Sequence, residues 1–177
     1  MGKIKEVLVD IEGPIFVNLN GDQFWDIVLV KDRRFCAIRI NDVNAYSISI
    51  IKQNGTPQRP IIHDVLLDLI VPLEFTVEKV IVTKYEISID AYFSILYLKR
   101  GDKTIEVDCG PSDAIAIALR QKAPIYINED LLITDEAFLN EVERAKMAFA
   151  ASTLSKDQIS VEEAQRLFDN LDPKKTH

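Results

Sequence analysis

The chain has 177 residues and a net charge of -7 at pH 7, and 47% of its residues are hydrophobic. This length allows one domain with a sizeable core and an appendage. No stretch approaches the roughly 20 apolar residues of a membrane span, and the N-terminus lacks the apolar core of a signal peptide. The negative charge counts against a non-specific nucleic-acid binder, because phosphate backbones are bound mainly through Lys and Arg. A local basic patch or a bridging metal could still serve a small site.

The two cysteines of the chain, Cys36 and Cys109, have no metal-ligand spacing. Their number does not indicate a disulfide-rich secreted protein either. We therefore expect a cytoplasmic protein with reduced thiols and no membrane association.

The first half of the chain has the pattern of three strands followed by two helices. Apolar runs and turn signals predict strands over residues 4–11, 24–30 and 35–40. Asn41 and Asp42 offer a cap for a helix over 43–53, which we expect to end at Asn54-Gly55, where glycine permits the left-handed conformation. After a proline-containing connector, apolar residues at helical spacing predict a second helix over 63–73.

The second half repeats the order of three strands and a helix. We expect strands over 76–84, 88–99 and 104–108, a helix that starts at Pro111, and a short strand over 125–127. Shifting the chain by 69 residues places Asn44-Ala45 on Asp113-Ala114 and Ile48 on Ile117. An internal duplication is one interpretation, and chance similarity between two apolar helices is the other. The whole pattern predicts an α+β fold with a mixed β-sheet body, made of two halves with three strands and a helix each.

The composition changes after Thr134. Residues 135–151 are rich in Ala and Glu and predict a helix, and the capping box that begins at Ser160 predicts a last helix over 161–171. We therefore expect a body over residues 1–133 and a helical extension over residues 134–177, packed on the body or on a partner subunit. The last few residues should fray.

His63 and Asp64 form the first candidate site, because histidine is the side chain best suited to move protons near neutral pH. The other histidine of the chain is its C-terminal residue. Neighbouring residues on a helix do not face each other. Capping of the predicted helix by these two side chains is therefore the alternative, and the residues alone favour it.

Asp108, Ser112 and Asp113 form the second candidate site, at a strand-to-helix corner that contains Gly110-Pro111. The carboxylates of Asp108 and Asp113 could hold Mg²⁺ or Mn²⁺, which prefers oxygen ligands and can neutralise a phosphate and activate water. Helix capping by Ser112 and Asp113 is again the alternative that the residues favour. Cys109 is expected to be a packing residue, since no histidine lies near it in the sequence.

Four segments of the chain resemble, in the right order, the signature blocks of the bifunctional nuclease family. They are Arg59-Pro60-Ile61-Ile62-His63-Asp64-Val65-Leu66, Ala91-Tyr92-Phe93-Ser94, Asp108-Cys109-Gly110-Pro111-Ser112-Asp113-Ala114-Ile115-Ala116-Ile117-Ala118 and Ala123-Pro124-Ile125-Tyr126-Ile127. The resemblance covers about residues 4–133. It implies a compact mixed α/β body with an internal duplication, assembly into homo-oligomers, and combined DNase and RNase activity.

The chain departs from the pattern of this family at three positions. Gly110 stands where the family usually has Arg, Ile62 where it commonly has Thr, and Asn44 where it favours Glu. Arg is a natural phosphate clamp and Glu a natural metal ligand or base. Two groups suited to phosphate chemistry are therefore absent from these positions.

The resemblance and the polar residues at helix starts together imply hydrolysis of phosphodiester bonds in DNA or RNA. In this hypothesis His63 is the general acid or base, Asp64 and Asp113 position a metal or water, Ser112 donates to a phosphate oxygen, and Arg59 stabilises its charge. It requires His63 and Asp113 to converge within hydrogen-bond reach, directly or through one water. The alternative is a non-catalytic oligomeric binding or regulatory module, which the acidic charge and the missing Arg and Glu favour. A hydrolase of small phosphate ligands is a third hypothesis.

Overall fold

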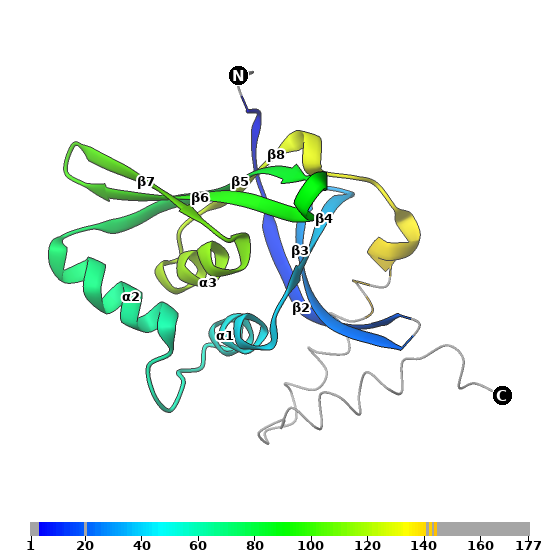
Figure 1. Cartoon of the computed structure of the whole chain (residues 1–177), viewed down its shortest axis with the longest axis horizontal. Coiled ribbons are helices and arrows are strands. Elements are labelled where there is room, and N and C mark those ends of the chain that lie inside the picture. The colour runs from blue at the N-terminus through cyan, green and yellow to red at the C-terminus, as the bar shows by residue number, and fades with distance from the viewer. Residues whose placement is uncertain (1–3, 20, 141, 143, 145–177) are drawn as a thin grey trace.

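The computed structural model describes residues 4–19, 21–140, 142 and 144, which form strands, α-helices and short 3-10 helices (Figure 1). No helix in this part of the chain is both long and apolar enough to cross a membrane. In chain order the elements are β1 (Glu6–Leu8), β2 (Asp10–Leu19), β3 (Asp22–Lys31), β4 (Arg34–Ile40), α1 (Asp42–Lys52), α2 (Ile62–Ile70), η1 (Val71–Leu73), β5 (Thr76–Glu86), η2 (Ile87–Ile89), β6 (Ala91–Arg100), β7 (Lys103–Cys109), α3 (Pro111–Gln121), β8 (Ile125–Asn128) and η3 (Glu129–Leu131).

The strands form two sheets. The larger sheet has the order β1-β8-β5-β6-β7, and the smaller sheet has the order β2-β3-β4. Paired strands are antiparallel in both sheets except β5 and β8, which are parallel. Figure 1 shows α3 and α1 beneath the larger sheet, with the smaller sheet to one side of them and α2 to the other. This arrangement confirms the α+β class with a mixed sheet.

The structure also supports the internal duplication. Adding 69 to the bounds of β3, β4 and α1 gives the bounds of β6, β7 and α3. The strand register follows the same shift, since Trp25 pairs with Ile40 in the first half and Ser94 with Cys109 in the second. The tight turns between these strands match too, because Asp32 and Gly101 occupy equivalent positions and both have a left-handed φ, of 55° and 57°.

Helix α3 lies at the centre of the core. All five residues from Ala114 to Ala118 are buried, and α3 contacts α1, α2, the strands β5 and β6 of the larger sheet, and β4 of the smaller sheet. Apolar side chains of both sheets join the same cluster. A helix that is apolar on every side is stable only when neighbours cover it on every side, and the alternation of Ala and Ile lets these neighbours approach closely.

A second, smaller apolar cluster covers the outer face of the small sheet. Val28 and Phe35 pack there against Leu139 and Val142, and residues 136–140 are helical. The first turn of this helix is capped by Asp135, whose Oδ1 accepts from the backbone N–H groups of Ala137 and Phe138. The start of the expected C-terminal helix therefore packs on the body. The rest of that helix beyond residue 144 and the one expected over 161–171 lie outside the described residues, and the division at residue 134 stays a prediction.

Several boundaries differ from the expectations. The second helix, expected over 63–73, is α2 up to Ile70, and the 3-10 turn η1 follows it. The single strand expected over 4–11 is two strands, β1 and β2, and β2 continues to Leu19 through Gly13, which has a positive φ of 91° that suits glycine. The left-handed residue that follows α1 is Asn54, with a φ of 55°, rather than Gly55. The strand expected from residue 88 starts at Ala91, because Ile87–Ile89 forms the 3-10 turn η2.

The central position of α3 can be tested with Ile115→Ala. Ile115 is fully buried, so the substitution removes buried apolar atoms and leaves a cavity. We expect the free energy of unfolding, measured by urea denaturation, to fall by about 3 kcal/mol. The matched control is Ile87→Ala at a side chain that is 83% exposed, where a change within about 0.5 kcal/mol is expected. Equal losses at both positions would contradict the core described here.

Candidate functional site

The first turns of α1, α2 and α3 meet beneath the larger sheet. Each helix begins there for a local reason. Asn41 caps α1 through a 2.8 Å hydrogen bond from the backbone N–H of Asn44 to its Oδ1. Helix α2 begins at the residue after Ile61, whose backbone N–H donates to Asp64 Oδ2 over 2.9 Å. Helix α3 begins at Pro111, whose fixed φ and missing N–H suit a first helical position.

His63 joins the three helices. Its Nδ1 lies 2.8 Å from the hydroxyl oxygen of Ser47 on α1, and its Nε2 lies 3.1 Å from Asp113 Oδ1 on α3. An ionised carboxylate can only accept hydrogen bonds, so Nε2 carries the hydrogen that is shared with Asp113. In the neutral ring Nδ1 is then the acceptor for the Ser47 hydroxyl. The convergence that the site hypothesis requires is present as a direct contact.

The three hydrogen-bonded side chains, Ser47, His63 and Asp113, differ in how far they are exposed to solvent. His63 is 1% exposed and Ser47 is fully buried, whereas the side chain of Asp113 is 47% exposed. Serine, histidine and aspartate are also the groups of a serine hydrolase, but there the serine must reach the substrate. Here the aspartate is the member that meets solvent. Asp113 is therefore the group through which this arrangement can contact a ligand.

Asn44 and Ser112 form a second contact between the same two helices. The Asn44 side-chain amide donates to the Ser112 hydroxyl oxygen over 2.8 Å. Because that oxygen already accepts a hydrogen bond, the Ser112 hydroxyl hydrogen is available to donate to another group. Asn44 occupies the position in the first half that Asp113 occupies in the second, so the two repeats contribute equivalent helix positions to one site.

Asp64 has a different environment from Asp113. Its Oδ1 accepts from Arg120 Nε over 2.6 Å, and its Oδ2 accepts from the Ile61 backbone. Partial burial alone would raise the pKa of Asp64, but the hydrogen bonds from Arg120 and Ile61 and the positive charge of Arg120 hold it below the usual value. The Arg120 side chain is 5% exposed, and its Nη2 is buried without a hydrogen-bond partner in the described part of the chain.

An open pocket of about 350 Å³ lies beside this ion pair. Asp64 and Arg120 contribute to its wall, whereas His63 and Asp113 do not. The other lining residues come from α2, η1 and the end of α3: they are Leu67, Asp68, Val71 and Gln121. Asp64 and Asp113 therefore face two different regions of the surface.

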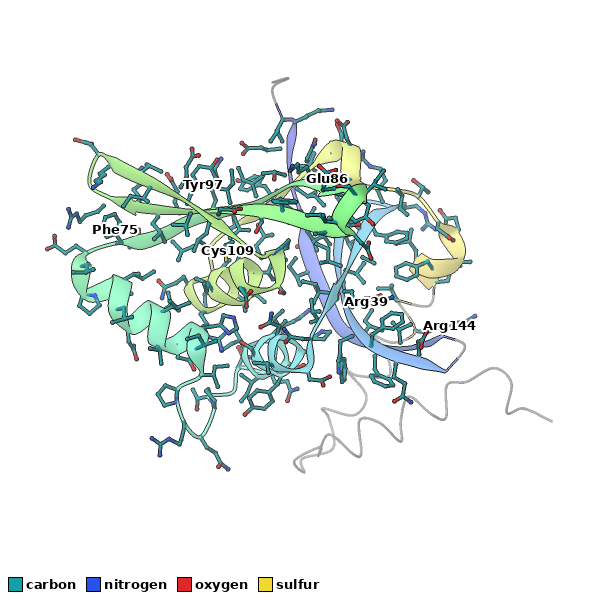
Figure 2. The ribbon with its side chains drawn as sticks, viewed as in Figure 1. Arg39, Phe75, Glu86, Tyr97, Cys109 and Arg144 are labelled. Atoms are coloured by element: carbon teal, nitrogen blue, oxygen red, sulfur yellow. The ribbon has the colours of Figure 1, made fainter. Side chains whose placement is uncertain are left out.

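The remaining candidates lie in two separate segments of the chain. Arg59 is exposed in the connector before α2, and Asp108 is exposed near the end of β7. Cys109 is the last residue of β7, two positions before the start of α3 (Figure 2). Burial, together with the negative charges of Asp113 and Asp108, raises the pKa of the Cys109 thiol to about 11. This thiol is thus protonated at neutral pH, and a packing role fits it better than that of a nucleophile.

The structure corrects the capping interpretation at one helix and supports it at the other. Ser112 and Asp113 do not cap α3, whose start has no side-chain cap. Their side chains bind Asn44 and His63 from neighbouring helices instead. Asp64 does close the first turn of α2, as the alternative for that residue expected.

Ser47 was not singled out from the sequence. The available signal was a polar residue three positions after Asn44, on the side of α1 that also carries the buried Ala45 and Ile48. Its partner His63 follows 16 residues later, and nothing in the local pattern connects the two.

The carboxylates of Asp108 and Asp113 are oxygen ligands of the kind that Mg²⁺ or Mn²⁺ prefers. The negative charges of Asp113 and Asp108 both help to raise the pKa of the Cys109 thiol. Asp108 is exposed on β7 between the half-buried Val107 and Cys109. Within residues 4–19, 21–140, 142 and 144, no group of three or more His, Cys, Asp or Glu side chains could hold a metal ion. Mg²⁺ is often bound through one or two carboxylates, and its binding at Asp113 and Asp108 stays a prediction.

Comparison with known proteins gives three informative matches. The profile described as the Bifunctional nuclease domain matches residues 27–140, which include the candidate residues above. An uncharacterised protein of Mycobacterium tuberculosis is 30% identical over 146 residues, which cover 77% of this chain and 81% of that protein. Bifunctional nuclease 2 of Oryza sativa subsp. japonica is 41% identical over 96 residues, which are 52% of this chain but 28% of the rice protein.

The Asp64–Arg120 pair predicts a pH-dependent stability. Because the folded-state pKa of Asp64 is lowered, its contribution is fully present above the unfolded-state pKa of about 4. It is lost as the pH falls through the lower folded-state value. We expect Asp64→Asn to reduce the free energy of unfolding at pH 7 by about 2 kcal/mol, since it weakens the pairing of a buried guanidinium.

The measurement is urea denaturation of wild type and variant at pH 7, 5 and 3, where the difference between them should shrink at pH 3. Asp68→Asn, one turn further along α2, is the matched control, since Asp68 is exposed. A deficit that is the same at all three pH values would count against the ion pair as its source.

Proposed function

The chain belongs to the bifunctional nuclease domain family, and from this membership we propose that it hydrolyses phosphodiester bonds of DNA or RNA. The observation that carries the proposal is the contact between the buried His63 and the half-exposed Asp113, in which His63 Nε2 lies 3.1 Å from Asp113 Oδ1. The neighbouring hydroxyl of Ser112 has its hydrogen available to donate. The name of the rice relative, Bifunctional nuclease 2, supports it.

In the proposed mechanism Asp113 is the group that accepts a proton from the attacking water. Its Oδ1 is held by His63, while its Oδ2 has no hydrogen-bond partner among the described residues. The water proton passes to Oδ2, the water oxygen bonds to phosphorus, and the bond from phosphorus to the leaving oxygen breaks. The leaving oxygen takes a proton from solvent. His63 acts through Asp113 here, because a ring that is 1% exposed cannot contact the substrate.

Gly110 leaves the Oδ2 atom of Asp113 accessible. A Cβ atom at this position would lie 3.3 Å from Asp113 Oδ2, which is a tight contact. The backbone at Gly110, with φ -59° and ψ 137°, does not itself require glycine. The replacement of the family's arginine thus removes a possible phosphate clamp and leaves more room in front of the carboxylate.

Three other residues complete the proposal. Ser112 donates its hydroxyl hydrogen to a phosphate oxygen, and the exposed Arg59 offsets the charge of the phosphate. Asp64 contributes by closing the first turn of α2, which fixes the position of His63. If a divalent ion is used, Asp113 and Asp108 would hold it, and the ion would supply charge neutralisation at the phosphate.

A non-catalytic module of the same fold is the second candidate. The observation that favours it is the burial of His63 and Ser47, which is also what a purely structural link between three helices requires. The two candidates differ in whether Asp113 matters for turnover or for stability alone.

Nuclease assays on matched variants distinguish them. With labelled single- and double-stranded DNA and RNA, with and without Mg²⁺, we expect Asp113→Asn to reduce hydrolysis at least about 100-fold. Asp102→Asn, at an exposed residue in the turn between β6 and β7, is the control and should keep full activity. Circular dichroism verifies that both variants fold. Activity that persists in Asp113→Asn would mean a different site or a contaminating enzyme, and absence of hydrolysis by wild type with every substrate and ion would favour the non-catalytic module.

The reactivity of Cys109 tests for the ion without an activity assay. Since the charges of Asp113 and Asp108 help to raise the thiol pKa to about 11, Mg²⁺ bound between them should lower it. In a Cys36→Ser background, we expect Mg²⁺ to accelerate alkylation of Cys109 at pH 9. Asp113→Asn should already react faster and respond less to Mg²⁺. A rate that does not depend on Mg²⁺ in the parent protein would contradict binding at these two carboxylates.

A further inference from the structure

The open pocket between α2 and the end of α3 has the make-up of a small binding site. Its first wall consists of Asp64, Leu67, Asp68 and Val71, whose spacing of three and four residues places them on one side of α2 and its continuation η1. The last turn of α3 supplies the other wall, and Figure 1 shows these two helices next to each other. The volume of about 350 Å³ lies at the lower end of the range for small-molecule sites, so the pocket suits a ligand as small as one nucleobase.

Two polar groups of this pocket lack a partner within the part of the chain that the structure describes. Arg120 donates from Nε to Asp64 and from Nη1 to the carbonyl oxygen of Ala116, whereas its buried Nη2 has no acceptor. Leaving a buried N–H group without an acceptor is costly, and such groups normally have one. Asp68 is exposed, and its carboxylate has no hydrogen bond or ion pair to a described residue. The pocket therefore offers a donor and a carboxylate to a ligand.

The charge of the pocket disfavours a phosphate group as its occupant. Two carboxylates, of Asp64 and Asp68, and one guanidinium, of Arg120, give the lining a net charge of -1. A phosphate would be repelled by Asp68, whereas a neutral ring with both donors and acceptors would not be. The apolar side chains of Leu67 and Val71 provide contact for the face of such a ring.

We propose that this pocket binds a guanine base of the nucleic acid that the chain cleaves, an inference that rests on the proposed nuclease function. Guanine has two neighbouring donors, N1–H and the N2 amino group, next to its carbonyl oxygen O6. The carboxylate of Asp68 can accept from both donors, one at each oxygen, and O6 accepts from Nη2 of Arg120. Adenine and cytosine have no ring N–H to donate, and uracil and thymine have no amino group beside theirs.

The position of the pocket suits a base near the phosphate that is cleaved. Arg120 follows Asp113 by seven residues on α3, a distance of about 10 Å along the helix axis. A nucleic-acid strand covers this distance in about three nucleotides. A strand whose phosphate lies at Asp113 could therefore place a nearby guanine between α2 and α3, and cleavage would then occur at a short, fixed separation from guanine.

Binding of free nucleosides to the full chain tests the pocket without hydrolysis. In isothermal titration calorimetry, guanosine should bind at least about tenfold more tightly than adenosine, cytidine or uridine. Asp68→Asn should shift the preference toward xanthosine, because the amide can accept from N1–H and donate to the carbonyl that replaces the amino group of guanine. We expect the ratio of the two affinities to change at least about 100-fold. Asp102→Asn, at an exposed residue, is the control and should keep the preference for guanosine.

Cleavage of oligonucleotides distinguishes a base of the substrate from a free nucleotide. With single-stranded oligonucleotides that contain one guanine, hydrolysis by wild type should concentrate within about three nucleotides of it, and Asp68→Asn should lose this preference. Asp113→Asn should lose hydrolysis but keep the affinity for guanosine, so failure of the nuclease proposal and failure of the pocket give different results.

Three outcomes would overturn the inference. Guanosine could bind no more tightly than the other nucleosides, or Asp68→Asn could keep the preference for guanosine over xanthosine. Cleavage that ignores the position of guanine, despite selective binding of guanosine, would exclude a base of the substrate as the occupant.

Discussion

The contact on which the arrangement depends is the pair of hydrogen bonds made by the buried imidazole of His63. Burying a polar ring is costly unless both nitrogens find partners. Here Ser47 and Asp113 provide them, from helices that belong to different halves of the chain. The requirement therefore fixes the middle of α1 and the first turns of α2 and α3 relative to one another, and it brings the carboxylate of Asp113 to the surface.

The duplication explains where this site lies and why it is asymmetric. Equivalent helices of the two halves, α1 and α3, begin side by side and are linked by Asn44 and Ser112. The repeat would place the same residues at both starts, yet Asn44 corresponds to Asp113 in the second half. An amide donates and accepts hydrogen bonds but does not ionise. Asn44 can therefore hold Ser112 in place, whereas Asp113 supplies a carboxylate.

The two carboxylates at the start of α2 and α3 illustrate how environment separates residues of the same type. Both carboxylate oxygens of Asp64 accept hydrogen bonds, one from Arg120 and one from the backbone N–H of Ile61. These hydrogen bonds lower the pKa of Asp64, and the second one closes the first turn of α2. Asp113 leaves one oxygen without a partner among the described residues, at a side chain that is nearly half exposed. Asp64 is therefore suited to stabilising the fold, and Asp113 is suited to contacting a ligand. Helix α2 contributes His63 and Leu67 to the interior, and its opposite side exposes apolar side chains to solvent.

The sequence by itself predicted most strands and helices in their order, offered a shift of 69 residues between the halves as one of two interpretations, and identified the family. Apolar periodicity and turn residues are local signals, and the signature blocks around His63 and Asp113 are contiguous. It could not determine that Ser112 and Asp113 bind across helices, since isolated residues of these types at a helix start normally cap it. It could not reveal Ser47 either. Which partner a polar side chain takes depends on elements that are distant in the chain, and only the packing of α1, α2 and α3 against one sheet brings those partners within hydrogen-bond distance.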